Sequence, residues 1–357
     1  MIRALSPYYI ETDLTYNQGG LKTCENYTLN IYVWDGDLSS IPTEPNYQIT
    51  YENNIDSTET HSINIAPVIR DYINFTQPTI SGNTQIVNGN NQQWVHVTVD
   101  YDNGGFVGQH PETDFMTLGY SYGNEGENNT TVNERTLLNP QDYRVSRFGA
   151  FVFPITTTGL NPLESNFVSV KSYPDNEISV NLTTVLDDLS SSQVQYVWID
   201  ISDTVNDNYI EILWNDQSTS LIITDDCKYT PLDVHFQNKD GALQTFQFLK
   251  QQENGIKITS KEFESNRGQA LNGYHQFIRH SVQARTTISA SSGYINEREN
   301  EVIKQLLLSE RVWTYKDNKY TPINIKKESL KFKTRRVDRL ISYDIDFELG
   351  YNEINNI

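Results

Sequence analysis

Residues Gly119 to Gly123, with the sequence GYSYG, match the G-x-S-x-G pattern that presents a nucleophilic serine in α/β-hydrolases. That arrangement needs a strand before the serine and a helix directly after it. The residues that follow, Asn124 to Asn129, are polar and predict a loop. The chain also lacks the alternation of strands and helices typical of this class. We therefore expect a glycine-rich loop and no catalytic serine.

A second candidate is the segment Asp100 to Gly105, which resembles the start of a calcium-binding loop. The EF-hand pattern requires another ligand at its fifth position, glycine at the sixth and glutamate at the twelfth. The fifth and twelfth positions are Gly104 and Pro111, so two requirements fail. Asp and Gly residues in a hairpin turn are the better interpretation.

Histidine and cysteine are too sparse for a structural zinc site, which needs four ligands. Cys24 and Cys227 are the two cysteines, and we expect free thiols in a reducing compartment, with a single bridge as the alternative. His275 and His280 are five residues apart, which does not place them on one helical face. The six histidines are His61, His96, His110, His235, His275 and His280.

Acidic side chains could act in pairs, because glycosidases use two carboxyl groups. With 46 acidic residues, chance pairs are expected and none is distinguished. We therefore assign no catalytic, cofactor-binding or metal-ligating residue, and expect a chain that is not an enzyme and needs no cofactor. The sequence identifies no partner-binding residue. The acidic pairs that are close in the sequence are Asp187-Asp188, Asp225-Asp226, and Glu125 with Glu127.

The formal net charge of −19 is unevenly distributed. Residues 1–226 contain 7 Lys and Arg against 30 Asp and Glu, whereas residues 227–357 contain 20 against 16. The abrupt change predicts a domain boundary near Asp225–Cys227. A strongly negative surface also argues against a general nucleic-acid binder.

Composition and strand spacing predict a mainly β protein of several β-sandwich domains. Tyr, Thr, Ile and Val are common, and predicted strands recur about every 8–15 residues with turn residues between them. We divide the chain into an N-terminal β-sandwich (1–76), its continuation or a second, acidic β-sandwich (77–226), and a C-terminal β-sandwich plus one helix (227–357). The clearest predicted strands are Tyr27–Trp34, Tyr47–Tyr51, Trp94–Tyr101, Val168–Tyr173, Tyr196–Ile201 and Ile210–Trp214.

The sequence also shows no targeting signal of the kinds that a membrane span or a signal peptide would give. No apolar run approaches the roughly 20 residues that a membrane span needs. The first residues lack the design of a signal peptide, so we expect no export by that route.

The C-terminal part is predicted in more detail. Asn238–Gly241 reads as the turn of a hairpin between Val234–Phe236 and Thr245–Phe248. A helix capped by Ser292 should follow, with a buried apolar stripe. The residues of that stripe are Ile295, Val302, Ile303, Leu306 and Leu307.

A final hairpin is expected between Ser329–Arg335 and Ile341–Leu349. One register of this hairpin pairs Lys with Asp residues on one face and apolar residues on the other. The agreement of both faces supports that register. The expected pairs are Lys333 with Asp344, Lys331 with Asp346, Phe332 with Ile345, and Leu330 with Phe347.

The basic stretch Lys326–Arg339 could contact phosphate groups, which clustered Lys and Arg neutralise. The expected register pairs much of it with aspartates, leaving Arg335, Arg336 and Arg339. We expect a solvated surface or a subunit contact rather than nucleic-acid binding. Exposed tyrosines and tryptophans beside polar groups would instead suit a sugar-binding surface.

Three segments resemble structural proteins of phages that infect Bacteroidota, including crAss-like podophages. The first comprises Ser6–Ile10, Tyr27–Gly36, Tyr47–Tyr51 and Ile65–Ile73; the second, Cys227–Pro231 and Val234–Gly241; the third, Leu306–Ser309, Val312-Trp313, Tyr320–Ile323 and the final hairpin. The third is similar to the β-sandwich-plus-helix domain of phage tail-tube, distal-tail and baseplate-hub proteins. The likeness covers most of the two ends and little of residues 80–220.

The resemblance implies a non-enzymatic virion protein of a phage tail, at the hub, baseplate or tube-adaptor level, assembled in the host bacterial cytoplasm. Its partners would be identical copies in a ring, together with tube, hub or fibre proteins. A closed ring buries sheet edges that otherwise promote aggregation. Long polar loops at Gly82–Gln93 and Gly123–Asn133 suit such contacts.

Two alternatives remain open. One is a carbohydrate-binding or adhesin-like receptor-recognition module, and the other is a glycan-degrading tailspike enzyme. Nucleic acid is expected only as a genome that passes through a lumen.

Overall fold

The computed structural model describes most of the chain, and every structural statement below concerns that part. The described residues are 2–12, 15–16, 22–23, 26–36, 38–52, 61–78, 84–89, 92–101, 107–109, 113–122, 138, 142–156, 168–173, 177–180, 194–201, 209–214, 217–224, 228–264, 273, 275–326, 329–333 and 341–353.

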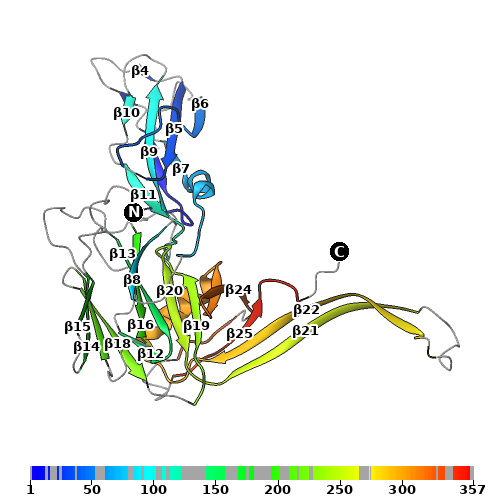
Figure 1. Ribbon diagram of the computed structural model, residues 1–357. Helices are drawn as coiled ribbons and strands as arrows, with labels where there is room; N and C mark the ends of the chain where they lie inside the picture. Colours follow the sequence, from blue (N-terminus) through cyan, green and yellow to red (C-terminus); the bar gives the residue numbers. More distant parts are fainter. Residues whose placement is uncertain are drawn as a thin grey trace.

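The protein is mainly β, as the sequence predicts, and has an N-terminal lobe above a larger body (Figure 1). The lobe is built on a six-stranded sheet of order β1-β11-β9-β5-β6, with β10 also paired to β9. Two small ribbons, β2–β7 and β3–β4, complete it. Its elements are β1 (Ile2–Arg3), β2 (Tyr9–Thr12), β3 (Thr15–Tyr16), β4 (Lys22–Thr23), β5 (Asn26–Trp34), β6 (Tyr47–Glu52), β7 (His61–Asn64), α1 (Ala66–Ile69), η1 (Arg70–Tyr72), β9 (Gln92–Tyr101), β10 (Val107–Gln109) and β11 (Asp114–Thr117).

The body contains three sheets. The first has five strands, β12 (Asp142–Ser146), β18 (Gln217–Thr224), β17 (Tyr209–Trp214), β14 (Val168–Tyr173) and β15 (Glu177–Val180); the second has three, β13 (Ala150–Thr156), β16 (Val194–Asp200) and β8 (Gln85–Asn88). The third has seven: β20 (Leu243–Phe248), β19 (Leu232–Gln237), β23 (Val312–Lys316), β24 (Lys319–Ile325), β25 (Asp344–Leu349), β22 (Phe277–Ser291) and β21 (Gln252–Glu264).

The three-stranded sheet is buried on both faces. Along β13, Phe151 and Phe153 pack into the core of the body, whereas Val152 packs into a second core shared with the N-terminal lobe. Strand β16 alternates in the same way, with Val197 in the first core and Trp198 in the second. This explains why both strands are almost continuously apolar rather than alternating.

The first of these cores contains residues from both sides of position 226. Phe153 and Ile212 come from the acidic part of the chain, and Phe236, Phe248 and Phe347 from the nearly balanced part. The three-part division of the chain remains a prediction, since Asp225–Cys227 lies outside the described residues.

The helix forms where the apolar stripe predicts it, but its start differs. Asn296 caps the short 3₁₀ turn η4 (Glu297–Glu299), which continues into α3 (Asn300–Leu308). The predicted cap, Ser292, is wrong: it is buried, and its hydroxyl donates to the Gly293 carbonyl and accepts from the Tyr343 amide. Val302, Ile303 and Leu306 are fully buried, as expected for an inward-facing stripe, whereas Ile295, predicted as part of that stripe, precedes the helix and forms a β-bridge with Ile341.

The register of the final hairpin is also wrong. Strand β25 lies between β22 and β24, so that Ile345 opposes Ala290 and Glu348 opposes Asn324. Both of its edges are therefore occupied, and residues 329–333 form no strand. The Lys–Asp alternation that supported the prediction comes from two segments that do not pair.

A turn of the body joins it to the N-terminal lobe. Arg3 donates to one carboxylate oxygen of Asp240 through Nε at 3.0 Å and Nη2 at 2.8 Å, and both side chains are largely buried. The Thr117 hydroxyl donates to the Asp240 carbonyl, and the Tyr120 amide donates to the Lys239 carbonyl. The predicted Asn238–Gly241 turn is thus confirmed, and it also holds the lobe in place.

We expect Arg3→Ala to lower the free energy of unfolding by about 3–5 kcal/mol, because it leaves the buried Asp240 carboxylate without its cation. Urea denaturation measures the change. Arg70→Ala is the control, since Arg70 and Asp71 form an exposed pair worth about 1 kcal/mol or less. Equal effects of the two substitutions would contradict this view of the junction.

Candidate functional site

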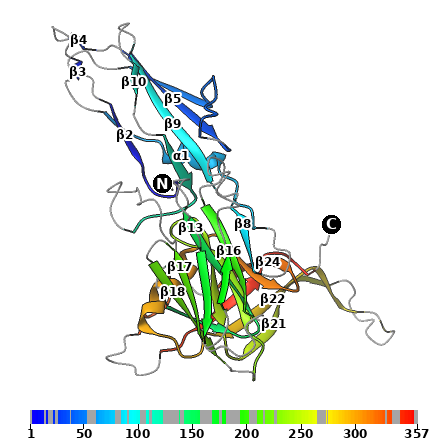
Figure 2. The ribbon, with the colours of Figure 1, turned by 60° about the vertical axis from the view of Figure 1, so that its left-hand side comes forward.

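The most prominent surface feature is a two-stranded ribbon, here called the arm, formed by β21 and β22. It extends far from the body, with its tip well away from both the body and the N-terminal lobe (Figure 1). Its 13-residue strand β21 corresponds to a length of about 40 Å. A second view, in Figure 2, shows the same projection.

The arm has unpaired edges. Strand β21 is the last strand of the seven-stranded sheet, so one of its edges has no strand partner among the described residues. On the other side, β22 pairs with β25 only from Thr287 to Ser291. A two-stranded ribbon alone is marginally stable in water, and free edges are templates for pairing with another chain.

Apolar side chains are exposed along the arm. Ile256 and Ile258 share one face near its base. At the tip Phe263 opposes Ile278, and Phe277 is next to that pair. These side chains are 38–59% exposed, which is unusual for five large apolar residues on one ribbon.

The base of the arm is fixed by charge. Arg285 donates to Asn352 and to Glu348, at 2.8 and 2.9 Å, and Lys326 also contacts Glu348. Lys326 and Arg285 hold the pKa of the Glu348 carboxyl group below its usual value. This network orients the arm where it leaves the sheet.

The arm also contains a bulge. The register of its two strands shifts between Thr259 and Lys261, opposite Ser281, whose φ is +51°. A bulge bends the strand and increases its twist. It therefore re-aims the tip relative to the base.

Sequence reasoning missed the arm. Both strands are predominantly polar, and their scattered isoleucines and phenylalanines do not alternate over a long run. The signal that was present is the high content of Thr, Ile and Ser between Gly255 and Ser291.

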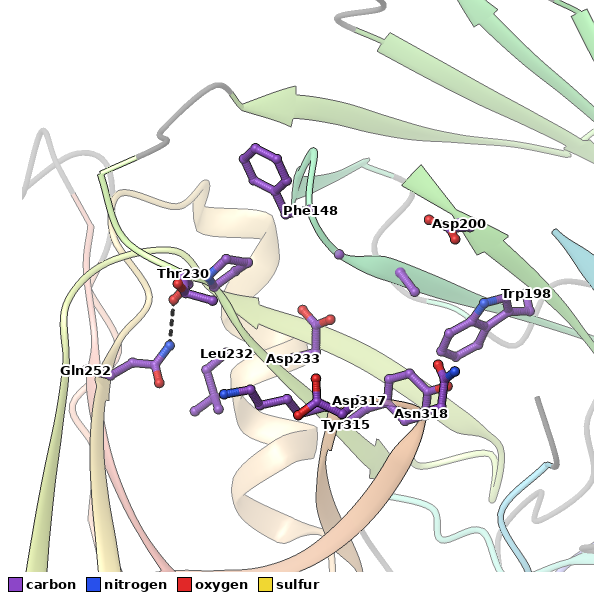
Figure 3. A pocket seen from close by; sticks show the side chains of 14 residues that line it. Phe148, Trp198, Asp200, Thr230, Leu232, Asp233, Gln252, Tyr315, Asp317 and Asn318 are labelled. Atoms are coloured by element: carbon purple, nitrogen blue, oxygen red, sulfur yellow. Dashed lines mark hydrogen bonds between the residues drawn. The ribbon is translucent and has the colours of Figure 1, made fainter. Parts of the chain in front are cut away.

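A second candidate is an acidic pocket of about 540 Å³ at the junction of β13, β16, β19 and the β23–β24 turn (Figure 3). Its lining combines aromatic and charged side chains: Phe148, Trp198, Tyr315, Asp200, Asp233, Asp317, Lys316 and Asn318. Phe148 is 66% exposed at the rim, whereas Trp198 is buried and packs edge-on against Tyr315. No group of three or more His, Cys, Asp or Glu in the described part of the chain could hold a metal ion.

Asp233 is the unusual group in this pocket. In Figure 3 its carboxyl group points into the space between Phe148 and Tyr315. Its Oδ1 atom is buried, and the carboxyl group interacts with the Ala150 amide and the Gln247 side chain. Burial raises the pKa of this carboxyl group to about 7, because removal from water disfavours the charged form.

The described G-x-S-x-G residues lie at the junction of the N-terminal lobe and the body. Gly119 is so close to the Asn238–Gly241 turn that a Cβ atom would lie 2.6 Å from the Lys239 carbonyl oxygen. The Ser121 amide donates to the Ser6 hydroxyl at 2.7 Å, and Tyr122 stacks under the Lys304 ammonium group. Tyr120, Ser121 and Tyr122 line a cavity of about 350 Å³, and Gly123 to Leu137 lie outside the described residues.

The histidines remain scattered. His235 is fully buried against Trp198 and Tyr320, and burial lowers its pKa to about 3, so the ring is neutral. His96 contacts the Thr113 hydroxyl through Nδ1 at 3.2 Å. His275 and His280 are exposed at the end of the arm, and His61 belongs to β7.

Several other candidates fall outside the described residues. These are Cys24, Cys227, His110, Asp102–Gly105, Pro111, the acidic pairs Asp187-Asp188, Asp225-Asp226 and Glu125 with Glu127, and Arg335, Arg336 and Arg339. Of the basic stretch, Lys331 is exposed, and the Lys333 amide donates to the Tyr343 hydroxyl. Asp100, in β9, accepts a hydrogen bond from Asn30 at 2.7 Å, which suits the expected hairpin strand.

No protein-family model matches the chain, and no curated protein matches it either. None of the helices in the described residues is long and apolar enough to cross a membrane.

We expect Gly119→Ala to lower the free energy of unfolding by about 1–3 kcal/mol, because the added methyl group collides with the turn backbone. Ser121→Ala should change it by less than about 0.5 kcal/mol, since Ser121 bonds through its main-chain amide. Thermal and urea unfolding compare the two. The reverse order would contradict a purely structural use of this motif.

Proposed function

We propose that this protein is a non-enzymatic building block of a phage tail, at the hub, baseplate or tube-adaptor level. It assembles as a ring in the host cytoplasm and anchors neighbouring tail proteins or fibres. The observation that supports this proposal is the arm, whose apolar side chains are exposed and whose outer strand edge has no strand partner among the described residues.

A second copy of the chain is the occupant that these features favour. The described arm residues carry four cations (Lys257, Lys261, Arg279 and Arg285) against three carboxylates. Residues 1–226 carry 30 acidic against 7 basic side chains, so another copy offers carboxylates that these four cations could contact. The arm is long, with strands of 13 and 15 residues, so it can reach a neighbouring copy of the chain.

Ring assembly accounts for the exposure of the arm. In a closed ring each copy both donates an arm and receives one, so that every unpaired edge is covered. The resemblance of the chain ends to phage tail proteins favours this setting over other assemblies. The carbohydrate-binding alternative receives separate support from the acidic pocket.

We expect the double substitution Phe263→Ser and Phe277→Ser to abolish self-association while leaving the fold intact, because both rings are exposed in the single chain. Sedimentation velocity over a range of concentrations measures this. Ile41→Ser is the matched control, since Ile41 is a similarly exposed apolar residue of the N-terminal lobe.

The control should sediment like the unmodified chain. A chain that remains monomeric at the highest concentration reached, or a double variant that associates as before, would contradict self-assembly through the arm.

A further inference from the structure

The acidic pocket has a size and chemistry that the assembly function does not use. Its volume of about 540 Å³ falls within the range of small-molecule sites, about 300–1,000 Å³. It lies on the body, at the ends of β16 and β19 and the β23–β24 turn, rather than on the arm. Its use is therefore independent of self-association.

The polar groups of the pocket complement a ligand that can both donate and accept hydrogen bonds. The Asp233 carboxyl group points into this space, and Asp200 and Asp317 are further acceptors on the same lining. Lys316 and Asn318 supply donors. A ligand with several hydroxyl groups can donate to these acceptors and accept from these donors at the same time.

The apolar groups add a second requirement. Phe148 presents an exposed ring at the rim, and Tyr315 forms part of the opposite wall in Figure 3. Aromatic rings beside polar groups suit ligands that have both an apolar face and hydroxyl groups. A pyranose ring has this combination, with C–H bonds on its faces and hydroxyl groups around its edge.

We infer that this pocket binds a saccharide unit, with hydroxyl groups donating to Asp233 and Asp317 and with the ring against Phe148. The ligand would be one or two residues of a glycan. Asp233 binds here rather than reacts.

A glycan array probed with the full chain, followed by isothermal titration of the best-bound soluble oligosaccharide, tests the site. At pH 8, above the pKa of about 7 of Asp233, Asp233→Asn and Asp317→Asn should each raise the dissociation constant about tenfold or more, because each weakens a hydrogen bond to a charged acceptor. Asn tolerates the left-handed backbone of residue 317, whose φ is +51°, so the turn is preserved. Phe148→Ala should also weaken binding.

Two controls separate this site from the arm. Asp71→Asn removes an exposed carboxylate on the N-terminal lobe and should leave glycan binding unchanged. The Phe263→Ser and Phe277→Ser double variant should bind glycan as the unmodified chain does, even if it no longer self-associates.

The inference is overturned if no glycan binds above the level of the Asp233→Asn and Asp317→Asn variants. It is also overturned if an oligosaccharide binds equally to the unmodified chain and all three pocket variants. Displacement of the bound glycan by n-butylammonium but not by free sugars would identify a cation site instead.

Discussion

The burial of the three-stranded sheet β13-β16-β8 on both faces is the constraint on which the remaining architecture depends. Phe151 and Phe153 face one core and Val152 and Trp198 the other, so the sheet is shared by the N-terminal lobe and the body. The Arg3–Asp240 pair and the close approach of Gly119 to the turn reinforce the same junction. Two lobes joined in this way form a firm base from which the arm projects.

A firm base matters for an arm whose outer part has no third strand beside it among the described residues. The Arg285–Glu348–Lys326 network orients the arm at its base, and the bulge at Ser281 bends it farther out. Its apolar side chains would otherwise be costly to leave in water, since each large side chain gains about 1.5–3 kcal/mol on full burial. The assembly that we propose would recover part of that free energy.

Much of the fold follows from the sequence. The strands over Val168–Tyr173 and Ile210–Trp214, the Asn238–Gly241 turn and the helix stripe were all predictable, because each rests on local periodicity or turn chemistry. The partner of β25 was not, because Lys and Asp residues that alternate on two nearby segments do not determine which strands pair. Long-range pairing with β22 depends on the whole sheet.

The candidate sites were harder to predict from the sequence than the strands and the helix. The acidic pocket gathers Asp200, Asp233 and Asp317 from three separate strands or turns, and no spacing in the chain relates them. The arm can be identified only from the sheet topology, because what distinguishes its strands is that little else in the described part of the sheet pairs with them. Conversely, the G-x-S-x-G pattern is visible in the sequence, but here its first glycine serves a close backbone contact.

Electron cryo-microscopy of the intact assembled particle tests the central claim most directly. The account predicts a ring of this chain in the tail, with each β21–β22 arm packed against the neighbouring copy and Phe263 and Phe277 covered. Arms that extend freely into solvent within such a ring, or a particle whose tail does not contain this chain, would contradict it.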